Sequence, residues 1–344
     1  MLSINPNRNV TRGFNRGTII NSNGNTRIVP LDFIDYVEAR HRGDNASKLN
    51  LEYESFITKE NFLVQNAIES NNKWESYSLI QDLSVRLNDF SLIDDLCENN
   101  FLLNCQTIDL HFNFSLTEKN FIFYLERIDL YVDARISIYV KSIDLTKELV
   151  DHINLTTNLV AVYCDFEFYP VEGLADKLFW KFRFKSDYNE SLNCIVSLSP
   201  SNQLILESKS VNNYLYKRAH IDEFGNILRF ENDDERFGKI TDPNLLANLK
   251  SDRFAALWYV NKDKIDVCKV CEFRYSCVDF RIPSARDNDE WYHTIECDYN
   301  PYVAKWKNEN GYISLCDSGV NVNSEKLTID HDRVATINKR IWGD

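Results

Sequence analysis

The chain has 344 residues, of which 44% are hydrophobic and 13% aromatic, and it carries a formal net charge of −13 with a sequence pI near 5.0. This length and apolar content predict two or three folded domains and exclude a disordered chain. The acidic balance argues against nucleic acid as a partner, because binding to phosphates needs a basic surface.

The first residues and the apolar runs of the sequence indicate where in the cell the protein is located. The first residues, MLSINPNRNVTRGFNRG, contain no apolar segment of the kind that signal peptides have, and no run reaches the roughly 18 apolar residues of a membrane span. We therefore expect a cytoplasmic protein with no membrane partner. Nine cysteines are an odd number and too few for a disulfide scaffold, and clustered thiols in a reducing compartment indicate metal binding.

Residues 1–90 predict a small unit of strands followed by helices. Within residues 8–29, short strand-like runs are interrupted by glycines and by an Asn-Gly turn signal, as in a β-meander. Pro30 then opens LDFIDYVEAR, which has helical spacing. Thr58 stands where the cap of a second helix, ENFLVQNAIES, would lie.

Residues 91–230 alternate between the two patterns. The strand-like runs are QTIDLHFNF, RIDLYVDARISIYV, NLVAVYCDFEFYP, LFWKFRFK and SLNCIVSLSP, and the helical segments between them are SLTEKNFIFYLERI and LTKELVDHINL. Strands that alternate with helices predict an α/β layer with parallel strands.

Residues 231–320 form a third expected domain, followed by a tail at 321–344. Its first part reads as helical, with Asp242 as a cap and Pro243 in the first turn. The most informative stretch follows, CKVCEFRYSC at residues 268–277.

Four cysteines of this domain form a candidate metal site. Cys268, Cys271 and Cys277 have C-x2-C-x5-C spacing, and Cys297 lies 20 residues further on. Four thiolates can hold Zn²⁺ or an iron–sulfur cluster, and the spacing does not decide between the two. The alternatives are a set of core cysteines without a metal, or a site in which His293 supplies the fourth ligand.

The segment around these cysteines resembles a known family. FAALWYVNKDKIDVCKVCEFRYSCVDFR, followed by ECDYNPYVAKW, is similar to the C-terminal SPASM domain of radical-SAM peptide maturases, and most similar to the SPASM proteins of grasp-with-spasm peptide-modification systems. The specific match covers residues 258–306. Besides the cysteines, the matching residues are Trp258, Lys262, Asp263, Ile265, Glu272, Phe273, Arg274, Tyr275, Asp279, Arg281, Tyr299, Asn300, Pro301, Tyr302 and Trp306.

The resemblance implies two four-iron clusters in a full SPASM domain, and this chain departs from that pattern. The ligand set of one cluster is complete in Cys268, Cys271, Cys277 and Cys297. At the recognisable ligand positions of the other cluster stand aromatic residues, Tyr214, Phe230 and Phe280. If the second cluster had been lost, its cavity would be empty, and an empty cavity costs stability. Apolar side chains at all three ligand positions would fill such a cavity.

The chemistry of the family does not carry over. Radical-SAM enzymes need a C-x3-C-x2-C loop that binds the SAM-cleaving cluster, and this chain has none. We therefore expect no SAM, and we interpret residues 91–230 as a degenerate radical-SAM-like domain. The fold expected from the resemblance is α/β: a degenerate partial (β/α) barrel between an N-terminal winged-helix-like unit and a C-terminal SPASM-type metal domain.

Residues 8–70 resemble, in element order alone, the leader-peptide recognition unit of such maturases, which pairs an extended peptide with an exposed sheet edge. Together these features predict a non-catalytic component of ribosomal-peptide maturation that binds a precursor peptide or scaffolds an ATP-grasp ligase. A redox-active maturase that uses the retained cluster and a structural zinc protein are the two alternatives. Whether the chain is an enzyme is left open, leaning towards not.

Overall fold

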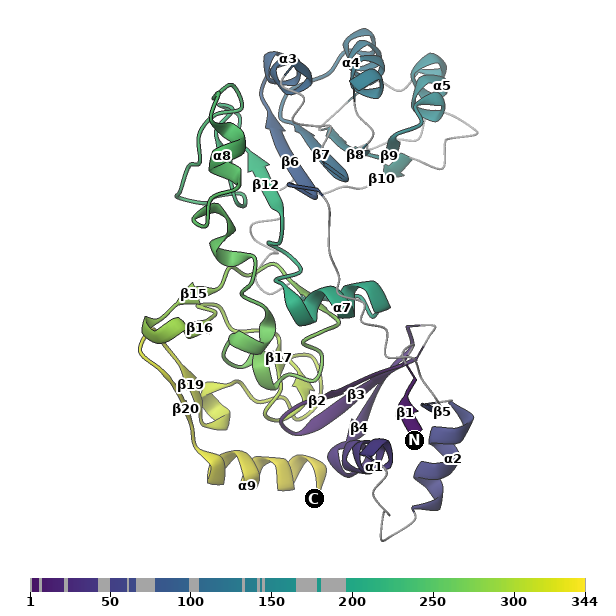
Figure 1. Cartoon of the computed structure of the whole chain (residues 1–344), viewed down its shortest axis with the longest axis vertical. Coiled ribbons are helices and arrows are strands. Elements are labelled where there is room, and N and C mark those ends of the chain that lie inside the picture. Colours follow the sequence, from purple (N-terminus) through teal and green to yellow (C-terminus); the bar gives the residue numbers. More distant parts are fainter. Residues whose placement is uncertain are drawn as a thin grey trace. The chain divides into compact units, whose positions relative to one another are not determined.

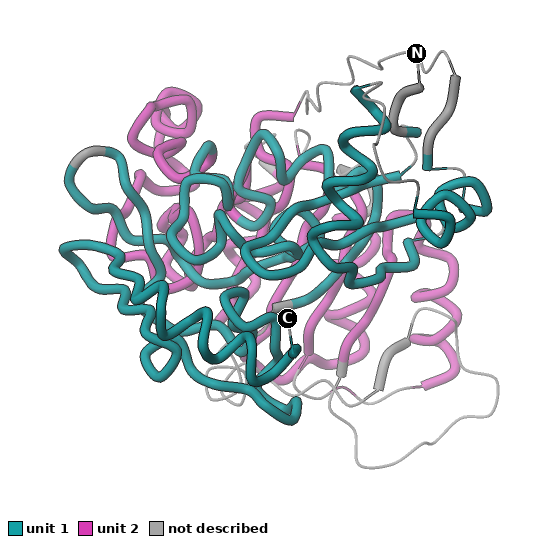
Figure 2. Tube along the Cα trace, turned by 90° about the horizontal axis from the view of Figure 1, so that it is seen from below, with its two compact units in different colours: residues 1–74, 192–214, 259–344 teal, residues 75–191, 215–258 magenta. Residues whose placement is uncertain are grey.

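The computed structural model describes residues 2–5, 8–21, 24–42, 50–60, 62–65, 78–98, 105–131, 134–140, 143, 146–164, 178–180 and 196–343. The chain divides into two compact units, which Figure 2 shows in different colours. Unit 1 comprises residues 1–74, 192–214 and 259–344, and unit 2 comprises residues 75–191 and 215–258. Unit 1 therefore joins the N-terminal segment and the cysteine-rich segment. No helix in the described part of the chain is both long and apolar enough to cross a membrane.

Unit 2 is built on a seven-stranded sheet in the order β10-β9-β8-β7-β6-β12-β13. The first six of these are parallel to their neighbours, and β13 is antiparallel to β12. The strands are β6 (Asp82–Leu87), β7 (Thr107–Phe112), β8 (Arg135–Val140), β9 (Leu159–Cys164), β10 (Leu178–Trp180), β12 (Arg218–Ile221) and β13 (Ile227–Leu228). The expected α/β class with a parallel sheet is thus confirmed.

The helices of unit 2 include α3 (Ser91–Glu98), α4 (Glu118–Tyr131), α5 (Lys147–Leu155) and α8 (Leu245–Leu249). Figure 1 shows α3, α4 and α5 on the same face of the sheet. The sequence explains this, because β6, β7 and β8 alternate in burial and only one side of each strand is apolar. Val85, Leu110 and Ile138 lie in one core with residues of these three helices.

The N-terminal part of unit 1 is a three-stranded antiparallel sheet with two helices. The strands β2 (Asn9–Arg12), β3 (Arg16–Ile20) and β4 (Thr26–Pro30) are followed by α1 (Leu31–Arg42) and α2 (Leu51–Lys59). A separate pair joins β1 (Leu2–Ile4) to β5 (Leu63–Gln65). The expected meander and the helix after Pro30 are confirmed.

The predicted helix after Thr58 is wrong in its described part. Asn50 caps the helix that contains Thr58, because its side chain accepts hydrogen bonds from the backbone N–H groups of Glu52 and Tyr53. The chain then enters β5. Residues 66–70 of the predicted helix lie outside the described residues.

The remainder of unit 1 has little regular structure. Its helices are α7 (Asn202–Ser210) and α9 (His331–Trp342). Its strands form two-stranded pairs: β11 (Val196–Leu198) with β14 (Cys277–Asp279), β15 (Ser284–Ala285) with β16 (Trp291–Tyr292), β17 (Tyr299–Asn300) with β18 (Lys305–Trp306), and β19 (Val320–Val322) with β20 (Leu327–Ile329). Such short ladders add little stability on their own.

A buried histidine makes the stability of unit 2 depend on pH. His220 on β12 is 4% exposed, and its Nδ1 lies 3.3 Å from Ser84 Oγ. Burial, with the charge of Arg86, lowers the pKa of His220 to about 4, whereas in an unfolded chain the pKa is about 6.5. The unfolded state therefore binds more protons between these values. The free energy of unfolding should fall as pH drops from about 6.5 to 4, by up to about 3 kcal/mol for this group.

We expect His220→Gln to reduce this pH dependence, with the part due to the similarly buried His111 remaining. The measurement is urea unfolding at pH 5 and pH 7.5, followed by far-UV circular dichroism. His152→Gln is the matched control, because the His152 side chain on α5 is 34% exposed. An unchanged difference between the two pH values in His220→Gln would contradict the assignment.

Candidate metal centre

The four predicted cysteines come from three local structures of unit 1. Cys268 begins a 3₁₀ turn, and the N–H of Cys271 donates to the Cys268 carbonyl at 2.9 Å, which closes the C-x2-C turn. Cys277 is the first residue of β14, and Cys297 lies two residues before β17. Val267, just before the turn, has φ of 67°, a conformation that is strained for a β-branched residue. Such strain persists only where the surroundings hold it in place.

The structure brings these four cysteines together. Cys268, Cys271, Cys277 and Cys297 all line one cavity of about 30 Å³. Phe273, Tyr299 and Trp306 line the same cavity, and the rings of these three residues contact one another. Four thiols that line one cavity beside an aromatic cluster are a donor set that suits a thiophilic metal or cluster.

Without a bound cation, burial disfavours the thiolate form of these cysteines. It raises the pKa of Cys268 to about 12, and it also raises the pKa of Cys271 and Cys277. A bound cation would reverse the effect, because coordination deprotonates a thiol. The residues present therefore fit a metal centre, in which the protein would supply four thiolates.

Two cationic side chains lie against the cysteines. Arg281 Nη2 is 3.8 Å from Cys268 Sγ. Lys262, which is 7% exposed, donates to the Cys277 carbonyl at 2.6 Å and to Asn213 Oδ1 at 3.3 Å. Positive charges at these positions would offset the negative charge of four thiolates.

A second constellation of side chains adjoins Cys268. Its ligand atoms, together with those of Asp279 and His293, lie within 4.8 Å of one another. Burial would raise the pKa of Asp279, but hydrogen bonds from Arg281 outweigh it and the pKa is lowered. Burial, assisted by the Arg281 charge, lowers the pKa of His293 to about 4. The carboxyl is therefore ionised and the imidazole neutral at pH 7.

The sequence analysis named His293 as a possible ligand but missed Asp279 in that role. A signal existed, because Cys277 and Asp279 are two apart and alternate residues of a strand point to the same face. The contact between this face of β14 and His293 depends on tertiary structure.

Of the three aromatic residues that the resemblance aligns with cluster-ligand positions, two contact each other. The rings of Tyr214 and Phe280 lie 5.0 Å apart at 87°, an edge-to-face contact within unit 1. Phe230 belongs to unit 2, where the Arg229 guanidinium lies over its ring at 5.8 Å.

The β2–β3 hairpin is attached to the cysteine segment. The N–H of Phe14 donates to the Val270 carbonyl at 2.8 Å, and Thr18 Oγ1 donates to the Glu272 carbonyl at 2.7 Å. At Gly13 an added Cβ would stand 2.6 Å from Glu272 Oε2, so only glycine allows this approach. The N-terminal sheet and the cysteine segment are thus one packed structure.

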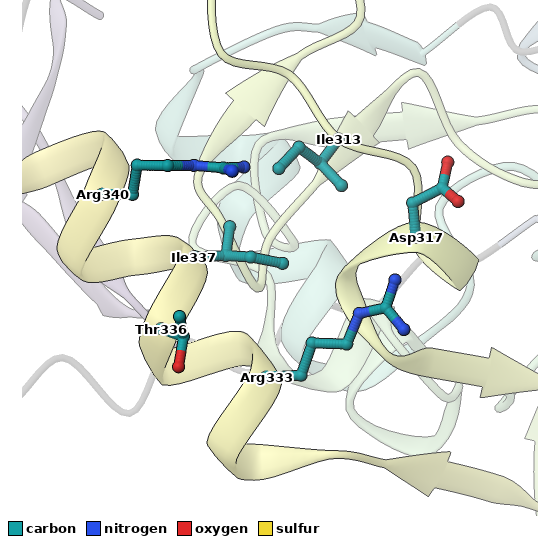
Figure 3. A pocket seen from close by; sticks show the side chains of 6 residues that line it. All are labelled: Ile313, Asp317, Arg333, Thr336, Ile337 and Arg340. Carbon is teal, nitrogen blue, oxygen red and sulfur yellow. The ribbon is translucent and has the colours of Figure 1, made fainter.

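A separate hollow lies beside α9, and Figure 3 shows its lining. It has a volume of about 490 Å³ and is lined by Ile313, Asp317, Arg333, Thr336, Ile337 and Arg340. Its charged side chains are exposed, so water already solvates them. The cysteine cavity is therefore the stronger candidate for a functional site.

Comparison with protein-family models, with curated proteins and with solved structures yields no match.

Proposed function

We propose that the protein is a non-catalytic, pseudo-radical-SAM component of ribosomal-peptide maturation. It binds a precursor peptide, presents that peptide to a partner such as an ATP-grasp ligase, and holds a SPASM-type metal centre. The observation that carries the proposal is the attachment of the N-terminal sheet to a cavity lined by four cysteines. Those contacts would link the sheet that carries the peptide-binding edge to the metal centre.

In this proposal Cys268, Cys271, Cys277 and Cys297 hold a [4Fe-4S] cluster or Zn²⁺. Two features bear on the choice. Among the described cysteines no three have their sulfurs all within 4.8 Å of one another, whereas a tetrahedral Zn–thiolate site needs spacings of about 3.8 Å. This favours a cluster, in which each thiolate binds a different iron. The volume of the cavity, about 30 Å³, instead suits a single ion or water. Metal analysis distinguishes the cluster from Zn²⁺.

Unit 2 fits the role of a degenerate partial barrel retained as a scaffold. Its six parallel strands carry helices on one face, which is the layering of a (β/α) barrel segment. The N-terminal sheet with α1 and α2 fits a winged-helix-like leader-recognition unit, in agreement with the element order.

The edge for the peptide is β4. The sheet order β2-β3-β4 leaves one side of β4 unpaired within this sheet. The Asn21 N–H donates to the Asn25 carbonyl. From this pair onwards, hydrogen-bonded and non-hydrogen-bonded residue pairs alternate along the antiparallel β3–β4 ladder. The N–H groups of Arg27 and Val29 therefore point to β3, while that of Ile28 points outwards. Ile28 is 45% exposed, and its outward N–H is what an added strand would use.

We expect Ile28→Pro to weaken binding of a precursor peptide at least about tenfold, because it removes one main-chain hydrogen bond and places a ring at the edge. Fold and thermal stability should change little, since edge strands tolerate proline at outward positions. The measurement is fluorescence anisotropy with a labelled precursor peptide of a grasp-with-spasm system. Ile28→Ala, which keeps the N–H, should bind within a few-fold of wild type. Equal affinity in wild type and Ile28→Pro would exclude this edge as the binding site.

The principal alternative is a redox-active maturase that uses the retained cluster. Cys268 and Cys297 line both the four-cysteine cavity and a neighbouring cleft. This favours the redox alternative, because a substrate in the cleft would have access to the centre. A structural zinc protein is the other alternative, and it would bind Zn²⁺ and no precursor peptide.

A further inference from the structure

The group formed by Cys268, Asp279 and His293 has the geometry of a metal site of its own. The three ligand atoms lie within 4.8 Å of one another. The side chains of Asp279 and His293 are 5% and 6% exposed, and Cys268 is 8% exposed. The group includes none of Cys271, Cys277 and Cys297, so only Cys268 is common to it and to the four-cysteine centre.

One ring nitrogen of His293 faces a backbone carbonyl, because Nδ1 lies 3.4 Å from the carbonyl oxygen of Ile282. A carbonyl can only accept, so this contact suits a hydrogen on Nδ1 and directs Nε2 towards the other side of the ring, where a metal would bind. An imidazole held at one nitrogen by a backbone carbonyl, with the other nitrogen free, is the usual arrangement of a metal-ligating histidine.

The His293 Nε2 atom is buried and has no hydrogen-bond partner among the described residues. It lies 3.5 Å from Asp279 Oδ2. For Zn–N and Zn–O bonds of about 2.0–2.2 Å, the two ligand atoms of a tetrahedral site stand about 3.4 Å apart, which matches the observed separation.

The Asp279 carboxylate is held in place by Arg281. Arg281 Nε donates to Oδ1 at 2.9 Å, and Arg281 Nη2 donates to Oδ2 at 2.6 Å. A carboxylate has about four lone-pair sites, so this bidentate pair leaves room for a metal bond. Outer hydrogen bonds of this kind orient ligating carboxylates in metal sites.

We propose that Cys268 Sγ, Asp279 Oδ2 and His293 Nε2 bind a mononuclear metal ion of the Zn²⁺ class, distinct from the metal of the four-cysteine centre. One sulfur, one nitrogen and one oxygen form a borderline-soft donor set that suits zinc. Cys268 joins the two sites, because a thiolate sulfur has lone pairs for two metals.

Two of the three proposed ligands border a cleft. Cys268 and His293 both line a cavity of about 220 Å³, together with Glu296, Cys297 and Cys316. Three protein ligands and one exchangeable position are the arrangement of zinc sites that bind a water or a substrate group, whereas structural zinc sites are closed by four protein ligands. The site would therefore take an exchangeable ligand from the cleft.

The test is the number of zinc ions bound per chain. The full-length protein is purified anaerobically and dialysed to equilibrium against Zn²⁺, and zinc and iron are then counted by mass spectrometry. Wild type should hold one zinc more than His293→Ala and His293→Gln. Gln nearly preserves the volume of the side chain, and circular dichroism establishes that both variants are folded. His331→Ala is the matched control, because His331 is an exposed histidine of the same unit, and it should bind as wild type does.

Equal zinc binding by wild type and both His293 variants would overturn the proposal. The metal that the folded His293 variants retain separates this failure from a failure of the four-cysteine centre, because these variants keep all four cysteines. The one-zinc difference between wild type and the His293 variants concerns the three-residue site alone.

Discussion

Cys277→Ser is expected to abolish metal binding at the four-cysteine centre and to unfold the cysteine-rich part of unit 1. Cys277 is 7% exposed and begins β14, which pairs with β11. A structural zinc contributes about 10–16 kcal/mol of apparent folding free energy in zinc-finger peptides, and the short strands here cannot replace a contribution of that order. The cost of losing one ligand should therefore far exceed the roughly 1 kcal/mol of a typical substitution.

The measurement combines metal analysis with thermal unfolding. Anaerobically purified wild type should contain either about four iron and four sulfide at the centre or about one zinc, and Cys277→Ser should contain neither at that site. Cys316→Ser is the matched control, because Cys316 is an exposed thiol of the same unit. A wild-type protein without either metal, or a Cys277→Ser variant that keeps both its metal and its melting temperature, would refute the centre.

Cys297→Ala distinguishes the scaffold proposal from the redox alternative. If the metal only stabilises the domain, this change should unfold it. If the metal performs chemistry, the domain should stay folded while peptide modification is lost. The variant is informative because Cys297 is only partly buried, so removing its thiol leaves a smaller cavity than at Cys277.

The parts of the fold that could be predicted are those in which local pattern and tertiary structure agree. The strands β7, β8 and β9 have apolar alternation and β-branched residues, so they were visible in the sequence. The strand β6 was missed, because DLSVRL is half polar and its alternation is clear only once one face is known to be solvated. The helix around Thr58 was misplaced, because its cap, Asn50, lies eight residues earlier.

In the candidate site, too, some features follow from local sequence and others depend on tertiary structure. The convergence of Cys268, Cys271 and Cys277 follows from spacing, since a C-x2-C turn directs two thiols to one side. The approach of His293 to Asp279 could not be predicted, because it depends on how separate short segments fold together. The docking of the β2–β3 hairpin joins residues about 250 positions apart, as in the bond from Thr18 to Glu272. No local pattern in a single sequence encodes such a contact.

A buried ion pair also stabilises the segment just before the cysteine turn. Arg286 is paired with Asp266, and the side chains are 2% and 5% exposed. Arg286 also donates to the Asn323 carbonyl at 2.9 and 2.8 Å. The Asp266 carbonyl accepts from the Cys268 N–H at 2.8 Å. The sequence placed Arg286 beside a run of acidic residues that reads as a solvated loop, so this role was not predicted.

Arg286→Met is expected to lower the stability of unit 1 by about 3–5 kcal/mol. Among the described residues, it leaves the buried Asp266 carboxylate paired only with the half-exposed Lys269. For a unit of this size the melting temperature should fall by about 6–20 °C, and metal retention should fall with it. Lys307→Met is the matched control, since Lys307 and Asp298 form an exposed pair whose loss should cost at most about 1 kcal/mol.

The double variant Arg286→Met/Asp266→Leu tests the cause. Replacing both partners of a buried pair with apolar groups is often neutral, whereas removing one partner strands a charge. The double variant should therefore recover most of the melting temperature lost in Arg286→Met. If it is as unstable as the single variant, the hydrogen bonds from Arg286 to the Asn323 carbonyl are the dominant contribution, and Arg286 stabilises the turn of β19 and β20 rather than the start of the cysteine segment.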